Sequence, residues 1–302
     1  MLQTLWARFL AVIGRTPKGG RITATASIAP CASSDFAYVL QTGQFSDPGC
    51  VRRRNEDSIL VRTPAGGREK SRNLLAVVAD GMGGHQAGDR ASQLAVATIG
   101  QTFAAADLPP DQALVAAFEA ANGLILNEAS HDAALAGMGT TATALAISDG
   151  RAWLAHVGDS RLYRLRDERL EQLSEDHTLV AAMLRDGLIT PEQAGDHPNR
   201  HVLIRAMGTH AKLDVMLAAV SLALGDVFLL CSDGLHDLVG SEDIRTCLLA
   251  RPPQAACAFL VELARQRGGF DNISVIAVRC GKPGAVPPGA PQTRDGGRHD
   301  HE

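Results

Sequence analysis

The stretch LLAVVADGMGGH, from Leu74 to His85, decides the fold of this chain because it joins a core strand to a charged turn. Its first five residues are all apolar, which is typical of a buried strand. The apolar run leads to the carboxylate of Asp80, and three glycines follow within positions 81–84. An ionised aspartate at the end of a core strand is costly to bury unless a cation or strong donors meet it, and glycines let backbone approach closely. The stretch therefore predicts either a bound metal ion or a solvated aspartate in a glycine turn.

The composition is that of an ordinary soluble globular protein, with 45% hydrophobic and 21% charged residues in a length of 302. That length suits one large domain or two small ones. The net charge of -4 argues against a nucleic-acid partner. No apolar run approaches the roughly 20 residues of a membrane-spanning helix, so no integral membrane segment is expected.

Six cysteines are scattered along the chain without a CxxC pair, at positions 31, 50, 231, 247, 257 and 280. Several lie in apolar runs, such as Cys231 in VFLLCSD, where a buried free thiol is the usual state. This pattern predicts a cytoplasmic protein, because thiols stay reduced in that compartment.

The two ends of the chain differ in composition from its middle. Residues 1–35 combine the apolar run LWARFLAVIG with a basic segment of small residues, which predicts a leader that is either a short helix with a linker or disordered. Residues 281–302 have almost no apolar bulk and predict a disordered tail. One domain, residues 36–280, is expected between them.

Apolar residues at helical spacing follow the opening stretch. They predict two antiparallel helices, at residues 87–106 and 110–130. The next segments are β-compatible runs separated by turn dipeptides, which predicts an antiparallel meander. These runs are TATALAISDG (141–150), RAWLAHVGDS (151–160) and RLYRLRDERLEQL (161–173).

The segment from Asp176 to Thr209 is polar and irregular, and it predicts an inserted flap with short helices at residues 179–186 and after Thr190. The other expected elements are strands at 37–42, 59–62, 227–231 and 273–279 and a helix at 255–267. This mixture of antiparallel strands and separate helices indicates an α+β fold.

Aspartates recur at the ends of the expected strands. Asp80, Asp159 and Asp233 each follow an apolar run, Asp271 comes just before one, and Asp57 lies in RNEDS. If these carboxylates meet at one rim, unneutralised like charges would repel by several kcal/mol at low effective dielectric. No accompanying set of cysteines and histidines suits zinc, so we expect all-oxygen coordination of Mg²⁺ or Mn²⁺.

Seven motifs in order resemble the metal-dependent serine/threonine protein phosphatases of the protein phosphatase 2C type, in their bacterial form. They are SDPGCVRRRNEDS, ADGMGGHQAG, GMGTTATA, HVGDSRLYRL, EDHTLV, CSDGLHDLV and GGFDNISVIAV. The resemblance runs from about Phe36 to Arg279. It implies a four-layer α-β-β-α sandwich of two mainly antiparallel sheets flanked by helices, with a flap insertion.

The resemblance also implies a site with two Mn²⁺ or Mg²⁺ ions. Asp80 would bridge both ions, and the Gly81 carbonyl would complete one coordination shell. Asp233 and Asp271 would hold one ion, and Asp57 would serve the other.

Other positions would support these ligands. Arg52 falls where the family places the arginine that grips the substrate phosphate, and a guanidinium offers paired donors to phosphate oxygens. Glu56 lies beside the first aspartate of the site, and Asp159 and Asn272 would orient ligands or hold loops. Arg52 and Asp80 are the candidate catalytic residues.

Three positions depart from the family pattern or have a role that stays open. A histidine follows the Asp-Gly pair in many eukaryotic relatives and is a candidate acid for the leaving group, but Met82 stands here. His85 is near in sequence, but we expect it to be a helix-start histidine that satisfies the backbone, and the general acid stays unassigned. Bacterial relatives often bind a third ion, and Asp132 is the candidate for it in this chain.

The resemblance implies hydrolysis of phosphoserine and phosphothreonine in proteins by a metal-activated water, with no covalent phosphoenzyme. The expected partners are phosphorylated proteins and a bacterial Ser/Thr kinase that the enzyme opposes, and a monomer is expected. Two alternatives are a catalytically silent scaffold that binds phosphoproteins and a phosphatase for one dedicated regulator such as an anti-sigma antagonist. The complete set of ligand positions and the flap argue against both.

Overall fold

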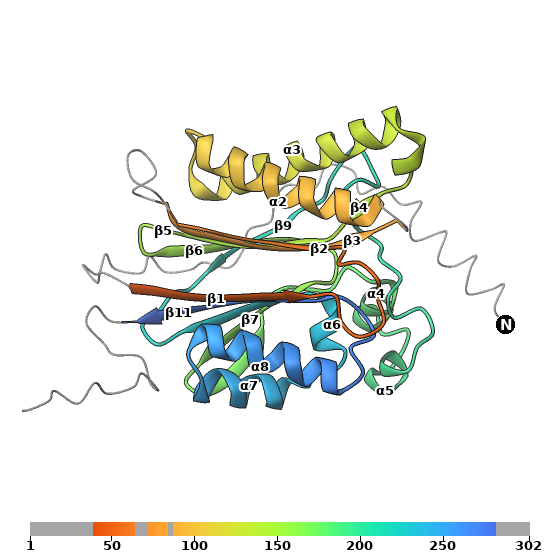
Figure 1. Ribbon diagram of the computed structural model, residues 1–302. Coiled ribbons are helices and arrows are strands. Elements are labelled where there is room, and N and C mark those ends of the chain that lie inside the picture. The colour runs from red at the N-terminus through yellow and green to blue at the C-terminus, as the bar shows by residue number, and fades with distance from the viewer. Residues whose placement is uncertain (1–38, 64–71, 84–86, 282–302) are drawn as a thin grey trace, which may run out of the picture. The chain divides into compact units, whose positions relative to one another are not determined.

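The computed structural model describes residues 39–63, 72–83 and 87–281. Their strands form two antiparallel sheets (Figure 1). The first sheet has five strands in the order β1-β11-β10-β7-β8. Its strands are β1 (Val39–Asp47), β11 (Ile273–Gly281), β10 (Val227–Cys231), β7 (Arg161–Arg166) and β8 (Arg169–Gln172).

The second sheet contains the opening stretch of the sequence. Its order is β2-β3-β5-β6-β9, and a short sixth strand, β4, pairs with the end of β3. The strands are β2 (Asp57–Arg62), β3 (Arg72–Met82), β4 (Gly139–Thr140), β5 (Ala142–Ser148), β6 (Arg151–Val157) and β9 (Met216–Val220).

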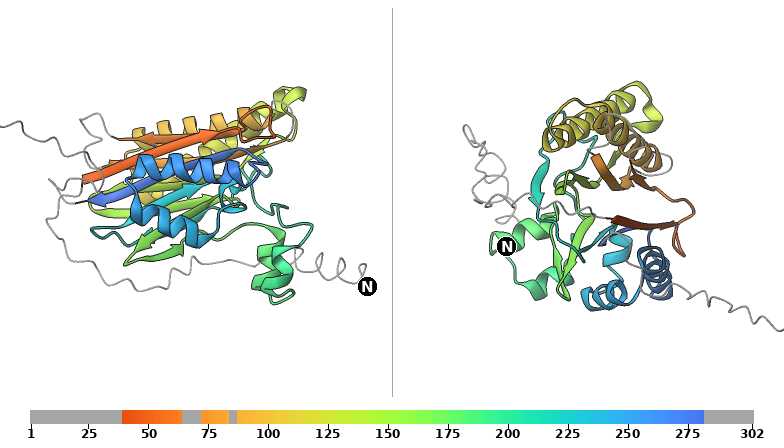
Figure 2. Two further views of the ribbon diagram at one scale, coloured as in Figure 1. Left: turned by 60° about the horizontal axis from the view of Figure 1, so that its bottom comes forward. Right: turned by 90° about the vertical axis from the view of Figure 1, so that its left-hand side faces the viewer.

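Two pairs of helices cover the outer faces of the sheets. α2 (Ala87–Ala105) and α3 (Pro110–His131) lie over the second sheet, whereas α7 (Ser241–Ala250) and α8 (Pro253–Gln266) lie over the first (Figure 1). The view along the strands in Figure 2 shows the sheets stacked between these pairs. The four-layer α-β-β-α sandwich is therefore confirmed.

Alternate side chains of β3 enter two different cores, which explains its uninterrupted apolar sequence. One set packs under α2 and α3, and the other set packs between the two sheets. The first set is Leu75, Val77 and Ala79, and the second is Leu74, Ala76 and Val78. Each large aliphatic side chain buried in this way contributes about 1.5–3 kcal/mol. The strand that carries Asp80 is thus fixed on both faces.

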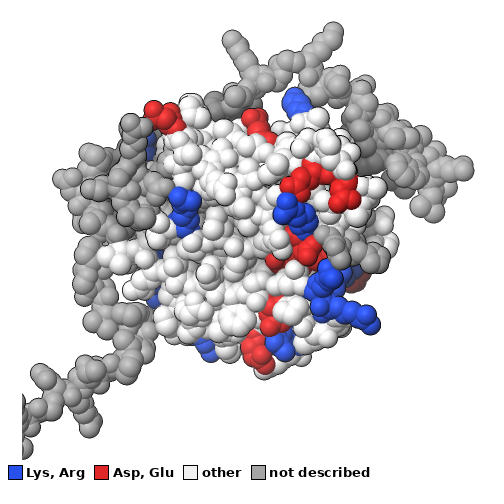
Figure 3. All heavy atoms as spheres, turned by 45° about the horizontal axis from the view of Figure 1, so that its top comes forward, with Lys and Arg blue, Asp and Glu red and all other residues white. Residues whose placement is uncertain are grey.

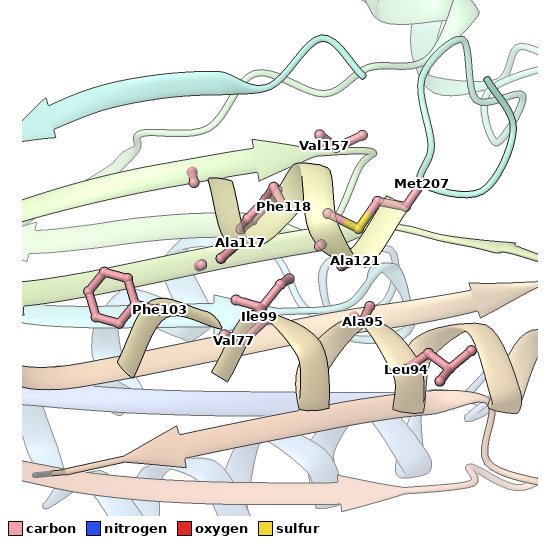
Figure 4. Close-up of a cluster of buried hydrophobic side chains, with 14 of the residues drawn as sticks. Val77, Leu94, Ala95, Ile99, Phe103, Ala117, Phe118, Ala121, Val157 and Met207 are labelled. Carbon is pink, nitrogen blue, oxygen red and sulfur yellow. The ribbon is translucent and has the colours of Figure 1, made fainter. Parts of the chain in front are cut away.

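The core under the helix pair combines large and small side chains. In Figure 4, Ile99 and Phe103 of α2 and Phe118 of α3 lie with Val77 of β3 in one buried cluster. Small residues such as Ala117 complete the cluster and let the helices lie close to the sheet. The predicted helices 87–106 and 110–130 match the observed ones to within one residue.

The predicted meander of residues 141–173 is wrong at its third strand. β5 and β6 pair with each other, but β7 pairs with β10 and β8 in the other sheet. The chain changes sheets at Gly158, which has a φ of +109°. A Cβ there would lie 2.6 Å from the side chain of Thr141, so the crossing also needs a residue without a side chain. Apolar alternation identifies a strand but not its neighbour.

The flap holds the two short helices that the sequence predicts. They are α4 (Leu179–Arg185) and α5 (Pro191–Gly195), and Thr190 forms a capping box with Gln193 at the start of α5. The predicted first strand is shifted, because β1 continues to Asp47. Neither α7 nor β9 was predicted.

Some expectations fall outside the described residues. The leader 1–35, His85 and all but the first residue of the tail 281–302 lie there. Among the helices that the structure describes, none is long and apolar enough to cross a membrane.

Candidate active site

Asp57 and Asp80 lie opposite each other at one end of the second sheet. Asp57 begins β2, Asp80 lies near the end of β3, and the antiparallel register pairs the two residues directly. Side chains of directly opposed residues emerge on the same face of a sheet. The register therefore brings two carboxylates together.

Asp233 reaches the same place from the first sheet. It follows β10 as the first residue of a short helix, α6 (Asp233–His236). The preceding Ser232 donates its hydroxyl hydrogen bond to Asp57 Oδ2 at 2.8 Å, which ties the ends of the two sheets together. Burial raises the pKa of Asp80, and the like charges of Asp57 and Asp233 raise it further, as expected for nearby carboxylates.

Two carboxylate oxygens of this group are buried without a partner. Among the described residues, Asp57 Oδ1 and Asp233 Oδ1 have no hydrogen bond. Burial, reinforced by neighbouring carboxylates, raises the pKa of Asp57 to about 7 and the pKa of Asp80 well above its usual range. The same causes raise the pKa of Asp233, and they raise the pKa of Asp159 to about 7. Such oxygens are costly to bury, and a cation would offset that cost.

The GMGTT motif holds the backbone of Asp80. Thr141 Oγ1 accepts a hydrogen bond from Asp80 N at 2.9 Å, and the Asp80 carbonyl accepts from Thr140 Oγ1 at 2.8 Å and from Thr141 N at 2.9 Å. Thr141 Oγ1 also lies 2.8 Å from Ser160 Oγ, next to Asp159. These contacts fix the end of β3 against the crossing between the sheets.

Both Asp-Gly motifs use their glycine for close contact between backbones. A Cβ on Gly81 would lie 2.0 Å from the carbonyl oxygen of Gly88, at the start of α2. A Cβ on Gly234 would lie 2.1 Å from the carbonyl oxygen of Asn272. Each aspartate is thus followed by a position where only glycine fits.

Asn272 connects the segment before β2 to the start of β11. Its Oδ1 accepts a hydrogen bond from Glu56 N at 2.8 Å, and its Nδ2 donates to Pro48 O at 3.0 Å and to Arg54 O at 2.8 Å. The buried amide therefore positions the loop that precedes Asp57.

Arg52 lies next to the aspartate cluster, which is the group Asp57, Asp80, Asp233 and Asp271. Its Nη2 donates to Asp271 Oδ2 at 2.6 Å, and its side chain is 52% exposed. Asp271 Oδ1 accepts from Asn272 N at 2.8 Å, so both oxygens of this carboxylate are engaged. A guanidinium held in this way presents further donors to solvent.

Asp80, Asp233 and Asp271 line a cleft of about 540 Å³. One part of its lining is the set Arg52, Glu56, Asp80, Gly81, Met82, Asp159, Asp233, Asp271 and Asn272. The flap supplies another part, with His201, Leu203, Ile204 and Arg205. On the face shown in Figure 3, acidic and basic side chains gather in the right-hand part, and most of the remaining described surface is uncharged. The cleft itself combines a carboxylate cluster with cationic side chains at its margin.

The flap is attached to the body at both of its ends. At its start, His177 N donates to Gly158 O at 2.7 Å, and Gly158 N donates to His177 Nδ1 at 3.1 Å. Near its end, the backbones of Met207 and Thr140 exchange two hydrogen bonds. Figure 2 shows the part with α4 and α5 extending beyond the sheets. The middle of the flap is thus carried on two fixed ends.

Comparisons with known proteins agree with this geometry. The profile of the family described as Protein phosphatase 2C matches residues 53–251. The Listeria monocytogenes serine/threonine phosphatase stp is 36% identical over 242 residues, which cover 77% of this chain and 93% of that protein. The chain belongs to the protein phosphatase 2C family. Family membership accounts for the order of the seven motifs as well as for the sandwich.

Relatives from Mycobacterium tuberculosis extend the comparison of this phosphatase 2C chain. It is 40% identical over 242 residues to serine/threonine protein phosphatase PstP, and the match covers 79% of this chain but only 44% of that protein. A crystal structure of PstP matches with a TM-score of 0.71, 39% identity, and coverage of 80% of this chain and 99% of that one. The PstP catalytic domain in complex with two manganese ions matches with a TM-score of 0.71 and 37% identity.

The phosphatase 2C fold does not bring Asp132 into the cleft. Asp132 ends α3 and begins a short 3₁₀ helix (Ala133–Leu135), where its Oδ1 accepts a hydrogen bond from Ala134 N at 2.9 Å. Its side chain is exposed and is not part of the cleft lining. The structure gives Asp132 a capping role.

Two further residues lie close to Asp233 in this phosphatase 2C domain, although the sequence did not single them out. His201 Nδ1 is 4.0 Å from Asp233 Oδ2 and 3.6 Å from Asp237 Oδ2. The spacing of Asp233 and Asp237, four residues apart in a helix start, was the available signal. His201 gave no signal, because only the folded flap brings it to α6.

Proposed function

We propose that this protein hydrolyses phosphoserine and phosphothreonine in other proteins, with two divalent metal ions as cofactors. The observation that carries the proposal is the cluster of Asp57, Asp80, Asp233 and Asp271 beneath a cleft, with two buried oxygens that have no partner within the described residues. Arg52 at the edge of the cleft is placed to bind an anion. A phosphate monoester suits both features.

The residues present fit Mn²⁺ or Mg²⁺. The donors are carboxylate oxygens, with the Gly81 carbonyl as a further candidate, and hard divalent cations prefer oxygen. Four carboxylates balance the charge of two divalent ions, so a phosphate dianion would not be repelled. When bound, such ions lower the pKa of a water and stabilise charge on phosphoryl oxygens.

The chain's own residues have separate parts in this mechanism. Asp57, Asp80, Asp233 and Asp271 would hold the ions, and the two Asp-Gly glycines keep the strand ends in place. Arg52 would bind two phosphate oxygens through its planar guanidinium, whose orientation Asp271 sets. Preorganised donors of this kind stabilise the transition state without moving during the reaction.

Activity measurements on matched variants test the proposal. The protein with Mn²⁺ should hydrolyse p-nitrophenyl phosphate and a phosphothreonine peptide, and EDTA should abolish both reactions. Asp233→Asn should lower kcat by at least about 100-fold. Asp149→Asn is the control, because Asp149 lies in an exposed turn before Gly150 and Asn-Gly suits such turns. Peptide binding without turnover would instead support the silent scaffold.

The cellular setting is also part of the proposal. We infer that the enzyme is a monomeric catalytic domain, residues 36–280, that acts in the bacterial cytoplasm against a Ser/Thr kinase and its targets. The five described cysteines are free and four of them are buried, which suits a reducing compartment. Loss of the gene should raise phosphorylation of kinase targets in a phosphoproteome, and size exclusion should give the monomer mass.

A further inference from the structure

The two most exposed large apolar side chains among the described residues flank the ion pair of Arg52 and Asp271. Val51 is 62% exposed and directly precedes Arg52 in the chain, whereas Phe270 is 63% exposed and directly precedes Asp271. Single exposed hydrophobic residues are common on protein surfaces. Two of them beside one functional arginine form a patch of the kind that marks a binding surface. We call these two side chains the rim patch.

Two hydrogen bonds join the loops that carry the rim patch. Cys50 N donates to Gly269 O at 2.7 Å, and Arg52 Nη2 donates to Asp271 Oδ2 at 2.6 Å. The residues of the rim patch lie between these two contact points, one in each loop. The patch is therefore carried by two backbone segments that adjoin each other.

Glycines at positive φ allow the close packing around the rim patch. A Cβ on Gly49, whose φ is +78°, would lie 2.2 Å from Asp271 O, so backbone contacts backbone there. Gly268 has a φ of +125°, and a Cβ on it would lie 2.4 Å from the ring of Phe270. The ring thus lies against Gly268 while much of it stays open to solvent. A side chain held in this way loses little conformational freedom when a partner covers it.

The rim patch continues the cleft in which the substrate phosphate would bind. Arg52 and Asp271 line that cleft, and each is the chain neighbour of one patch residue. Consecutive Cα atoms are about 3.8 Å apart, in the enzyme and in a bound substrate alike. When Arg52 holds the phosphate of a phosphorylated residue, the residues one or two positions away in the substrate are therefore within reach of the patch.

We propose that the rim patch binds a large apolar side chain of the protein substrate, within two positions of the phosphorylated residue, and so selects among substrates. The two patch side chains offer neither a charge nor a hydrogen bond, so they favour an apolar residue over a charged one. Covering them removes apolar surface from water, which stabilises the complex. This inference rests on the proposed hydrolysis of phosphoserine and phosphothreonine and names the substrates that the same site prefers.

Rates on a set of phosphothreonine peptides test the proposal. One peptide has alanines around the phosphothreonine, and four others carry a single leucine one or two positions before or after it. With Mn²⁺, the parent should hydrolyse at least one leucine peptide with a kcat/KM about fivefold above that of the alanine peptide, mainly through a lower KM. Phe270→Ser should remove this preference and leave the rate on the alanine peptide unchanged. Equal rates of the parent on all the peptides would overturn the proposal.

Two further variants separate docking from effects on folding. Phe270→Leu retains an apolar side chain and should retain the preference. Phe259→Ser is the matched control, because Phe259 is also exposed but lies on α8 beneath the guanidinium of Arg251, outside the rim patch. It should show the same preference as the parent. Equal loss of the preference in Phe259→Ser and Phe270→Ser would contradict the role of the patch.

The outcomes also distinguish this inference from the function on which it rests. Turnover of the alanine peptide without any leucine preference would overturn the inference alone, whereas a lack of turnover on every peptide would overturn both. The alternative occupant of the patch is a second copy of the chain. If the parent shows no leucine preference but forms a dimer in size exclusion that Phe270→Ser dissociates, the patch pairs two copies and the proposal is overturned.

Discussion

Replacing Asp57 with asparagine should make the metal-free protein more stable while weakening its response to Mn²⁺. The Asp57 side chain is buried, its Oδ1 has no partner within the described residues, and its pKa is about 7 instead of 3.8. The difference between these pKa values corresponds to about 4 kcal/mol of destabilisation at alkaline pH. The new amide needs partners of its own, so we expect a net gain of about 2 kcal/mol and a rise in Tm of about 4–8 °C.

The gain in stability of Asp57→Asn over the parent should increase as the pH rises. Between pH 3.8 and about 7, Asp57 keeps its proton in the native state but loses it on unfolding, so its contribution to stability falls as the pH rises. The advantage of Asp57→Asn should therefore be complete near pH 8 and small near pH 4. Calorimetry in EDTA at both pH values measures it.

Two comparisons make this test decisive. Mn²⁺ should raise the Tm of the parent by mass action and raise the Tm of Asp57→Asn by a smaller amount, because Asp57 would serve one of the two ions. Asp149→Asn, which removes an exposed carboxylate, should follow the parent in every condition. The reasoning is refuted if Asp57→Asn melts below the parent in EDTA near pH 8, or if its advantage is the same near pH 4.

Three other substitutions test single contacts. Gly234→Ala should cost about 1–3 kcal/mol in urea unfolding, because its Cβ would press on Asn272 O, whereas Gly123→Ala, with open space in α3, should stabilise by up to about 1 kcal/mol. If Gly234→Ala does not unfold with a lower free energy than the control Gly123→Ala, the steric account is contradicted. Asn122→Ala should speed flap proteolysis and cost about 1–3 kcal/mol, since the buried amide holds Gly208 N and His210 O; unchanged cleavage would argue against this anchor. His156→Gln should lose less stability than the parent as the pH falls from 6.5 to 4, because burial lowers the pKa of His156 to about 4 and the unfolded state binds the proton first. If the stability of His156→Gln and that of the parent fall in parallel over this pH range, the prediction is refuted.

Much of the fold could be predicted from sequence where burial leaves a pattern. The continuous apolar runs of β3 and β10 identified strands buried on both faces, and helical spacing located α2 and α3. The pairing of strands left no such pattern in the sequence. The sequences of β6 and β7 both indicate a strand, although the two strands lie in different sheets. α7 was missed because only Ile244, Cys247 and Leu248 of its residues are buried, which is a narrow apolar stripe.

The candidate site, like the fold, could be predicted from the sequence only in part. Aspartates at strand ends were visible as a group, since strand ends meet at one edge of a sheet. Asp132 had the right residue type but lies at the end of α3, where it caps the next turn. His201 could not be found, because the flap that brings it to α6 has no repeating pattern that fixes its path.

The contact between Gly81 and Gly88 has a consequence for mutational scanning. Backbone touches backbone there, so any side chain at either position would displace the end of β3 or the start of α2. A saturation screen scored by growth or turnover would mark both glycines as intolerant as the aspartates. Such a screen would therefore mark the residues that folding requires together with those that catalysis requires. Only a separate measurement of the amount of folded protein would distinguish the two groups.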